Sequence, residues 1–188
     1  MYKFFKLITI SIVFFVSCKN NSLTKENPFY LGDSILLEHN FIENINTTCD
    51  MKGNTFEDYS EIDWYEYEKR CVISILDKKY RDLMLNNYSI LENKNIKVYV
   101  KNIQNENNPK LYLFTYNNSI KIDSLQIYGM EKTSTPSTKN FYYYINKNWE
   151  VWILTVITVE EGTFFNNRKK YRLDSQTGKF ELVDSMED

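Results

Sequence analysis

The chain has 188 residues, a hydrophobic fraction of 43%, an aromatic fraction of 16% and a formal net charge of −2. So many apolar and aromatic residues exclude a chain that is disordered throughout. The near balance of 23 Lys and Arg residues against 25 Asp and Glu residues does not favour a nucleic-acid partner, because domains that bind nucleic acid carry a marked positive charge.

Residues 1–17 have the pattern of a secretory signal peptide. A start that contains Lys3 and Lys6 is followed by an apolar run over residues 7–16 and then by Ser17 and Cys18. The apolar run is too short for a membrane-spanning helix, which needs about 20 such residues. A charged start, a short apolar run and a small residue before the cleavage site are typical of an exported protein.

Val16, Ser17 and Cys18 resemble the lipobox of bacterial lipoproteins, from which Phe15 departs because leucine is usual at that position. The resemblance covers residues 1–18 only. It implies that the signal peptide is removed and that a lipid such as palmitate is attached to the sulfur of Cys18. The implied location is the cell envelope, and Lys19 favours the outer membrane, facing the periplasm or the cell surface, because some lipoproteins of the inner membrane carry aspartate there.

The remainder of the chain is predicted to form one domain behind a tether. Residues 18–30 are polar and lack periodicity, which indicates a flexible segment after the lipidated cysteine. Residues 31–188 are enough for a single domain with a sizeable core. Within this domain, residues 33–45 fit either a short helix or a strand, and the pattern does not decide between them.

An amphipathic helix is predicted over residues 57–88, where apolar residues recur at steps of three and four. One apolar stripe consists of Trp64, Tyr67, Cys71 and Ile75, a neighbouring stripe of Val72, Leu76, Tyr80 and Leu83, and Cys71 is expected to point inward. With Cys18 assigned to the lipid, Cys49 and Cys71 remain as an even pair in an exported domain. Export permits a disulfide, so we expect a Cys49–Cys71 bridge that clips the helix to the preceding segment.

From residue 96 the hydrophobic period changes to two, which predicts consecutive strands. A bulge is expected near residues 123–124, where the apolar parity changes, and a loop over residues 129–139. Strands are expected around residues 96–100, 111–116, 120–127, 141–145, 149–159, 163–173 and 179–183. The predicted fold class is α+β, with an N-terminal helical region packed on a C-terminal antiparallel β-meander.

Residues for catalysis or metal binding are sparse. His39 is the only histidine and has no nucleophile motif beside it, so we expect neither a catalytic triad nor a metal site, and no cofactor. The densest acidic group surrounds Trp64. Paired carboxylates there are compatible with a glycan-acting envelope enzyme, although a solvated helix start explains the same pattern.

The densest aromatic group lies in the predicted strands over residues 141–152. Tyr142, Tyr144 and Trp152 can share one sheet face, which makes them a candidate binding surface, while sheet core is the competing interpretation. We therefore predict a non-enzymatic binding module held at a membrane by its lipid. Its partner is expected to be a protein, as in a subunit of an envelope complex or a toxin-neutralising protein; the alternative is the glycan-acting enzyme.

Overall fold

The structure is a computed structural model that describes residues 32–51, 64–81, 88–93, 95–105, 108–133 and 136–187. The expected signal peptide, Cys18 and the expected tether lie outside these residues. In the described part of the chain all helices precede all strands, so the predicted α+β class is confirmed.

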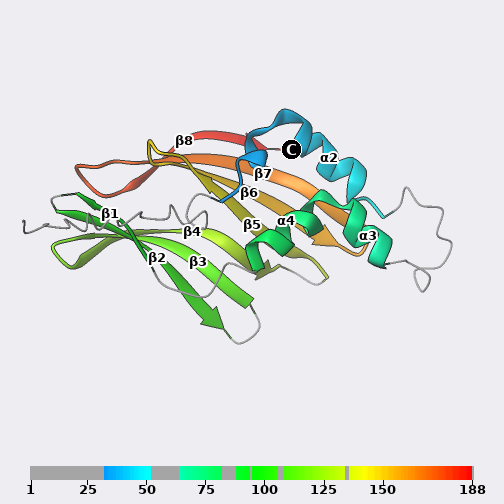
Figure 1. Ribbon diagram of the computed structural model, residues 1–188, viewed down its shortest axis with the longest axis horizontal. Helices are drawn as coiled ribbons and strands as arrows, with labels where there is room; N and C mark the ends of the chain where they lie inside the picture. The colour runs from blue at the N-terminus through cyan, green and yellow to red at the C-terminus, as the bar shows by residue number, and fades with distance from the viewer. Residues whose placement is uncertain are drawn as a thin grey trace, which may run out of the picture.

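Short helices and eight strands make up the described residues (Figure 1). The helical segments are the 3₁₀ helix η1 (Ser34–Leu37) and the α-helices α2 (His39–Thr48), α3 (Trp64–Arg70) and α4 (Val72–Arg81). The strands are β1 (Tyr88–Asn93), β2 (Ile96–Asn105), β3 (Asn108–Asn117), β4 (Ile120–Lys132), β5 (Thr138–Ile145), β6 (Glu150–Val159), β7 (Gly162–Leu173) and β8 (Phe180–Glu187).

The strands follow one another in the sheet in chain order, each antiparallel to the next, but β4 divides the sheet into two parts. Residues 120–128 of β4 pair with β3, whereas residues 129–132 pair with β5. Gly129 stands at the change of partner with φ +130°. A side chain there would begin 3.0 Å from the carbonyl oxygen of Pro109. Beyond this point β1–β3 diverge from β5–β8 (Figure 1).

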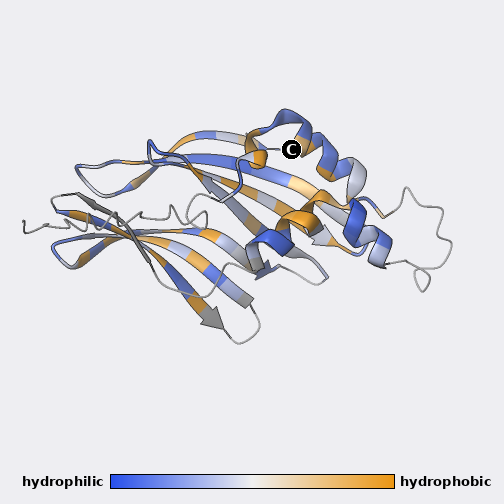
Figure 2. Ribbon diagram, viewed as in Figure 1, coloured by the Kyte–Doolittle hydropathy of each residue, from blue (hydrophilic) through white to orange (hydrophobic). Residues whose placement is uncertain are grey.

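The hydrophobic pattern of the strands determines which face of the sheet is buried. Buried side chains alternate with less buried ones along β2 and β3, in line with a strand period of two, and the alternating hydropathy is visible in Figure 2. The inward residues are Ile96, Val98 and Val100 on β2 and Leu111, Leu113 and Thr115 on β3. Tyr99 and Lys101 on β2 and Tyr112, Phe114 and Tyr116 on β3 alternate with these residues and therefore face outward.

Where β4 leaves β5, the edge of β5 gains a different neighbour. Gly32 forms an isolated antiparallel bridge with Tyr144, and the amide of Asp33 donates to the carbonyl oxygen of Tyr143 at 3.3 Å. The chain just before η1 thus takes the place that β4 vacates, which satisfies backbone groups that would otherwise be exposed on an open edge.

Tyr80 of α4 lies at the same division and is only 4% exposed. Its hydroxyl donates to the carbonyl oxygen of Tyr143 and accepts from the amide of Asp33 at 2.9 Å. The centroid of its ring lies 5.3 Å from that of Tyr128 on β4 and 5.7 Å from that of Tyr142 on β5. Burial raises the pKa of Tyr80 above its ordinary value, so the hydroxyl stays protonated. One side chain therefore connects both parts of the sheet.

The predicted Cys49–Cys71 disulfide is present, with both cysteines fully buried. Cys49 follows α2, and its carbonyl oxygen accepts from the amide of Thr163 on β7 at 3.0 Å. Cys71 separates α3 from α4. The bridge therefore holds the helices to a segment that is itself hydrogen-bonded to the sheet.

The single helix predicted over residues 57–88 differs from the structure. Two helices meet at Cys71, and residues 57–63 and 82–87 lie outside the described residues. Trp64 and Ile75 of the first predicted stripe are 58% and 44% exposed. Leu76 and Tyr80 of the neighbouring predicted stripe are buried together with Ile73, because they pack against the core of the sheet.

Other boundaries were predicted with mixed success. Residues 33–45, for which helix and strand were both open, form η1 and most of α2. The expected bulge is confirmed, since the β3–β4 register shifts between Asp123 and Lys121. The loop predicted over residues 129–139 is shorter, because residues 129–132 and 138–141 pair with each other as strand. Strand β1 was not predicted at all.

Replacing Tyr80 by phenylalanine is expected to lower the free energy of unfolding by about 1–3 kcal/mol, because the amide of Asp33 and the carbonyl of Tyr143 would lose a buried partner. Equilibrium denaturation measures the change. Tyr171→Phe is the control, since the Tyr171 hydroxyl forms no hydrogen bond among the described residues. Equal effects of the two substitutions would contradict the role assigned to Tyr80.

Replacing Cys49 and Cys71 together by serine is expected to reduce stability by about 3 kcal/mol, because the unfolded chain would regain the entropy that the closed loop removes. Denaturation of the variant and of the unreduced protein gives the difference. Intact mass should also rise by two hydrogen atoms on reduction. Labelling of both thiols in denatured, unreduced protein would show that the bridge is absent.

Candidate functional site

Tyr142 does not belong to an open surface. It is 3% exposed, and its ring lies against those of Tyr80 and Tyr128 at centroid distances of 5.7 and 5.8 Å. Its hydroxyl donates to Asp77 of α4 at 3.4 Å. The expectation that Tyr142 shares an exposed face with Tyr144 and Trp152 is therefore corrected, because α4 covers its part of the β5 face.

Tyr144 and Trp152 do lie side by side. They are cross-strand partners on β5 and β6, and their rings are 5.7 Å apart. Lys170 of β7 is the next residue across the sheet, and its Nζ atom lies 4.8 Å from the centre of the Trp152 ring. Tyr144, Trp152 and Lys170 are all partly exposed, so this end of the sheet face remains accessible within the described structure.

A carboxylate fixes the cations beside these rings. Glu150 is 15% exposed and lies 2.8 Å from Lys170 and 3.3 Å from Arg172. The hydrogen bond from Lys170, followed by that from Asn146, lowers the pKa of Glu150 to about 2. The carboxylate is therefore ionised at neutral pH and holds both cations in place. We call this group the Trp152 patch, which consists of Tyr144, Glu150, Trp152, Lys170 and Arg172.

The edge strand β8 extends the surface beyond the Trp152 patch. Its residues after Phe180 are exposed throughout. Large apolar side chains stand out among them, namely Leu182, Val183 and Met186. They alternate with acidic residues, which discourage unspecific pairing of an open edge. Apolar and charged side chains thus adjoin the patch, as in the core and rim of a protein interface.

A cleft with a volume of about 570 Å³ lies between α4 and the sheet. We call it the α4 cleft. Polar and aromatic side chains line it from both layers, among them Ser74, Asp77, Asn140, Phe141, Tyr142 and Thr158. Their hydrogen-bonding groups are largely engaged with one another: Tyr128 donates to Asp77 at 3.0 Å, and Asn140 donates to Thr158 at 3.0 Å.

The acidic group around Trp64 is only partly described. Glu57, Asp58, Glu61 and Asp63 lie outside the described residues. Glu66 pairs with Lys69 at 3.1 Å, and Glu68 pairs with Lys78 at 2.9 Å. Glu68 also lines the α4 cleft together with Asp77. Two carboxylates therefore border one cleft, while Trp64 is exposed beyond it.

His39 lies at the start of α2, away from the cleft-lining residues, and its Nδ1 atom is 3.4 Å from Glu43. Across the described residues, no group of three or more His, Cys, Asp and Glu side chains is arranged to hold a metal ion. The helices that the structure describes include none long and apolar enough to cross a membrane.

A second group of outward rings was missed at the sequence level. The outer face of strands β2, β3 and β4 carries aromatic and basic residues. We call this surface the aromatic–lysine face, and it consists of Tyr99, Lys101, Tyr112, Phe114, Tyr116 and Lys121. Tyr112, Phe114 and Tyr116 alternate with the buried Leu111, Leu113 and Thr115. That alternation was the available signal, since it places three rings of one strand on the outer face.

No protein family, curated protein or solved structure matches this chain.

Proposed function

We propose that the protein is a lipid-anchored lipoprotein of the cell envelope that acts as a non-enzymatic binding module. In this proposal the N-terminal helical region, packed on the C-terminal antiparallel β-meander, is a rigid support for the Trp152 patch. The observation that carries the proposal is the pair of adjacent rings, Tyr144 and Trp152, with Lys170 and Arg172 oriented beside them by Glu150.

The chemistry of the patch favours a protein partner. Tryptophan, tyrosine and arginine are the residues in which binding energy at protein interfaces is concentrated. Trp152 is held between Tyr144 and Lys170 by ring contacts, so little side-chain entropy remains to be lost when a partner covers it. Another subunit of an envelope complex and a toxin are both proteins that could cover the Trp152 patch. Both kinds of partner can be met by a protein that is anchored at the envelope through Cys18.

A glycan-acting enzyme is the second candidate, because Glu68 and Asp77 both line the α4 cleft. A general acid and a general base need free access to substrate oxygens. Asp77 instead accepts hydrogen bonds from two tyrosine hydroxyls, and Glu68 is paired with Lys78 at the surface. These contacts support binding over turnover as the main activity.

Alanine substitution of Trp152 is expected to weaken binding to a partner by about 30-fold or more, the effect of losing a hot-spot side chain, with little change in melting temperature. The partner would be identified by cross-linking in intact envelopes and then titrated in purified form. Tyr142→Ala is the matched control, because loss of this core ring should cost about 3–5 kcal/mol of stability.

Two outcomes would contradict this part of the proposal. One is that Trp152→Ala and Tyr144→Ala leave the affinity unchanged in folded protein. The other is that the wild-type protein releases products from a glycan and that Asp77→Asn abolishes the release, which would favour the enzyme.

Cys18→Ser is expected to move the protein from the membrane fraction to the soluble fraction or to leave it with its signal peptide attached. Stable anchoring requires at least two acyl chains or an equivalent second signal, and without Cys18 the resemblance to lipoproteins offers no attachment point. Fractionation of cell envelopes and intact mass measure both effects. A variant that fractionates and migrates like the wild type would show that the lipoprotein assignment is wrong.

A further inference from the structure

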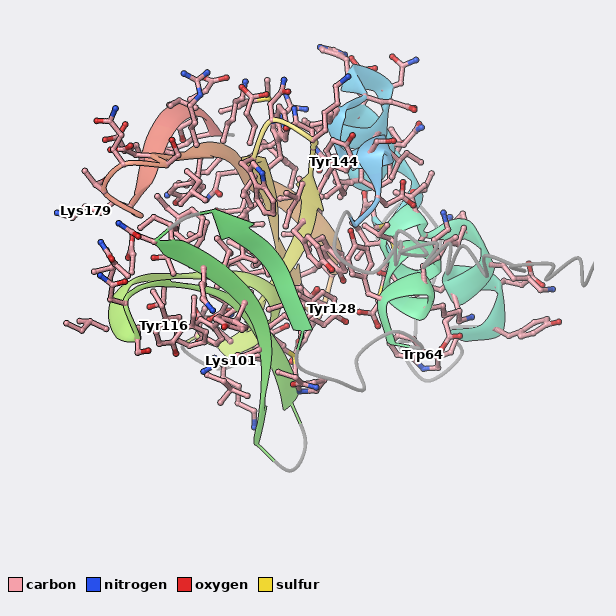
Figure 3. The ribbon with its side chains drawn as sticks, turned by 60° about the vertical axis from the view of Figure 1, so that its left-hand side comes forward. Trp64, Lys101, Tyr116, Tyr128, Tyr144 and Lys179 are labelled. Atoms are coloured by element: carbon pink, nitrogen blue, oxygen red, sulfur yellow. A yellow bond between two sulfur atoms is a disulfide. The ribbon has the colours of Figure 1, made fainter. Side chains whose placement is uncertain are left out.

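The aromatic–lysine face is a continuous surface across three strands. Phe114 and Tyr116 lie on the central strand β3, Lys101 on β2 and Lys121 on β4. In Figure 3, Lys101 and Tyr116 lie together on the outer side of these strands, away from Tyr144 and the helices. This surface is therefore separate from the Trp152 patch.

The rings of this face are arranged in two neighbouring pairs. Tyr112 and Phe114 have centroids 5.8 Å apart, and Tyr99 and Tyr116 have centroids 5.6 Å apart. All four side chains are partly exposed. The planes of Tyr112 and Phe114 are tilted by 34°, so these two rings offer neighbouring apolar platforms to successive sugars, whereas Tyr99 and Tyr116 meet edge to face at 83°.

Two ammonium groups converge on one ring of the face. The Nζ atom of Lys101 lies 5.3 Å from the centre of Phe114, and that of Lys121 lies 4.6 Å from the same centre. Lys101 also donates to the hydroxyl of Tyr116 at 2.8 Å. Neither lysine forms an ion pair with a carboxylate in the described part of the chain. Their charge is therefore available to a ligand.

We propose that the aromatic–lysine face binds an acidic glycan, a chain of sugar rings that carry carboxylate, sulfate or phosphate groups. The apolar faces of the sugars stack on Phe114 and Tyr112, and the anionic groups pair with Lys101 and Lys121. Aromatic rings alone would suit a neutral glycan, and two lysines alone would suit a simple anion. The combination of rings and lysines is complementary to a glycan that carries negative charge.

Nucleic acid and a membrane surface fit the face less well. Binding of nucleic acid depends on neutralising many phosphates, whereas this face contributes two unpaired lysines in a chain of net charge −2. Docking on a membrane depends on apolar side chains that enter the headgroup region. The rings of this face lie partly buried among their neighbours instead.

The test uses full-length protein in nonionic detergent, titrated with polygalacturonate and with its fully methyl-esterified form, which keeps the sugar rings and removes the charge. The wild type should bind the acidic chain and not the ester, and added salt should weaken binding. Lys101→Gln combined with Lys121→Gln should reduce the affinity about tenfold or more, with the melting temperature unchanged.

Lys179→Gln is the charge-matched control, because Lys179 is an exposed lysine at the β7–β8 turn, which packs through Gly178 against the inner residues Ile96 and Thr115 and not on the outer face. Figure 3 labels it apart from Lys101 and Tyr116. Lys179→Gln should keep the wild-type affinity, as should Trp152→Ala, whose partner binding is a separate property. If the double variant does not fold, Phe114→Leu replaces it and should also lose affinity.

Several results would overturn the proposal: equal binding of the esterified chain, no binding of polygalacturonate, or an unchanged affinity in a folded double variant. Tighter binding to vesicles of phosphatidylcholine and phosphatidylglycerol, or to polythymidylate, through the same two lysines would also overturn it and would identify the surface as a site for membrane or nucleic acid. None of these results bears on capture of a protein at Trp152.

Discussion

The division of the sheet within β4 is the constraint on which the rest of the structure depends. A strand that changes partner at Gly129 leaves the rest of β5 without β4 as its neighbour. Tyr80 lies at this division, bonds the backbone of Tyr143 and Asp33, and contacts Tyr128. Because the hydroxyl bonds two backbone groups at once, its loss would leave them only the 3.3 Å hydrogen bond between the amide of Asp33 and the carbonyl oxygen of Tyr143.

The same division separates the two outward surfaces. One part of the sheet carries helices over Tyr142 and leaves Tyr144 and Trp152 accessible. The other part turns Lys101 and Tyr116 outward, away from Tyr144 (Figure 3). A disulfide from Cys49 to Cys71 holds the helices against the first part. A protein partner and a glycan would thus be able to bind without competing for the same strands.

The sequence was informative where a single physical effect dominates. The period of two located most strands, and the even number of cysteines after Cys18 predicted the bridge. The sequence was misleading where tertiary packing decides which face of a helix or strand is buried. Tyr80 of α4 packs against Tyr128 and Tyr142, so the stripe that contains Tyr80 is buried and Ile75 of the other stripe is exposed. Tyr142 has the same parity as Tyr144, and only the position of α4 separates a core ring from an accessible one. The short strand β1 lacked a pattern distinct from the helix expected before it.

The most direct test of the account is whether one ring contacts both parts of the sheet in solution. Nuclear Overhauser effects can be measured between tyrosine rings in full-length protein with selectively labelled tyrosine. The centroid of the Tyr80 ring lies 5.3 Å from that of Tyr128 on β4 and 5.3 Å from that of Tyr143 on β5. Rings this close give nuclear Overhauser effects, so cross-peaks from Tyr80 to both are expected. Cross-peaks to only one of these rings, or to neither, would contradict the claim that Tyr80 joins the divided sheet.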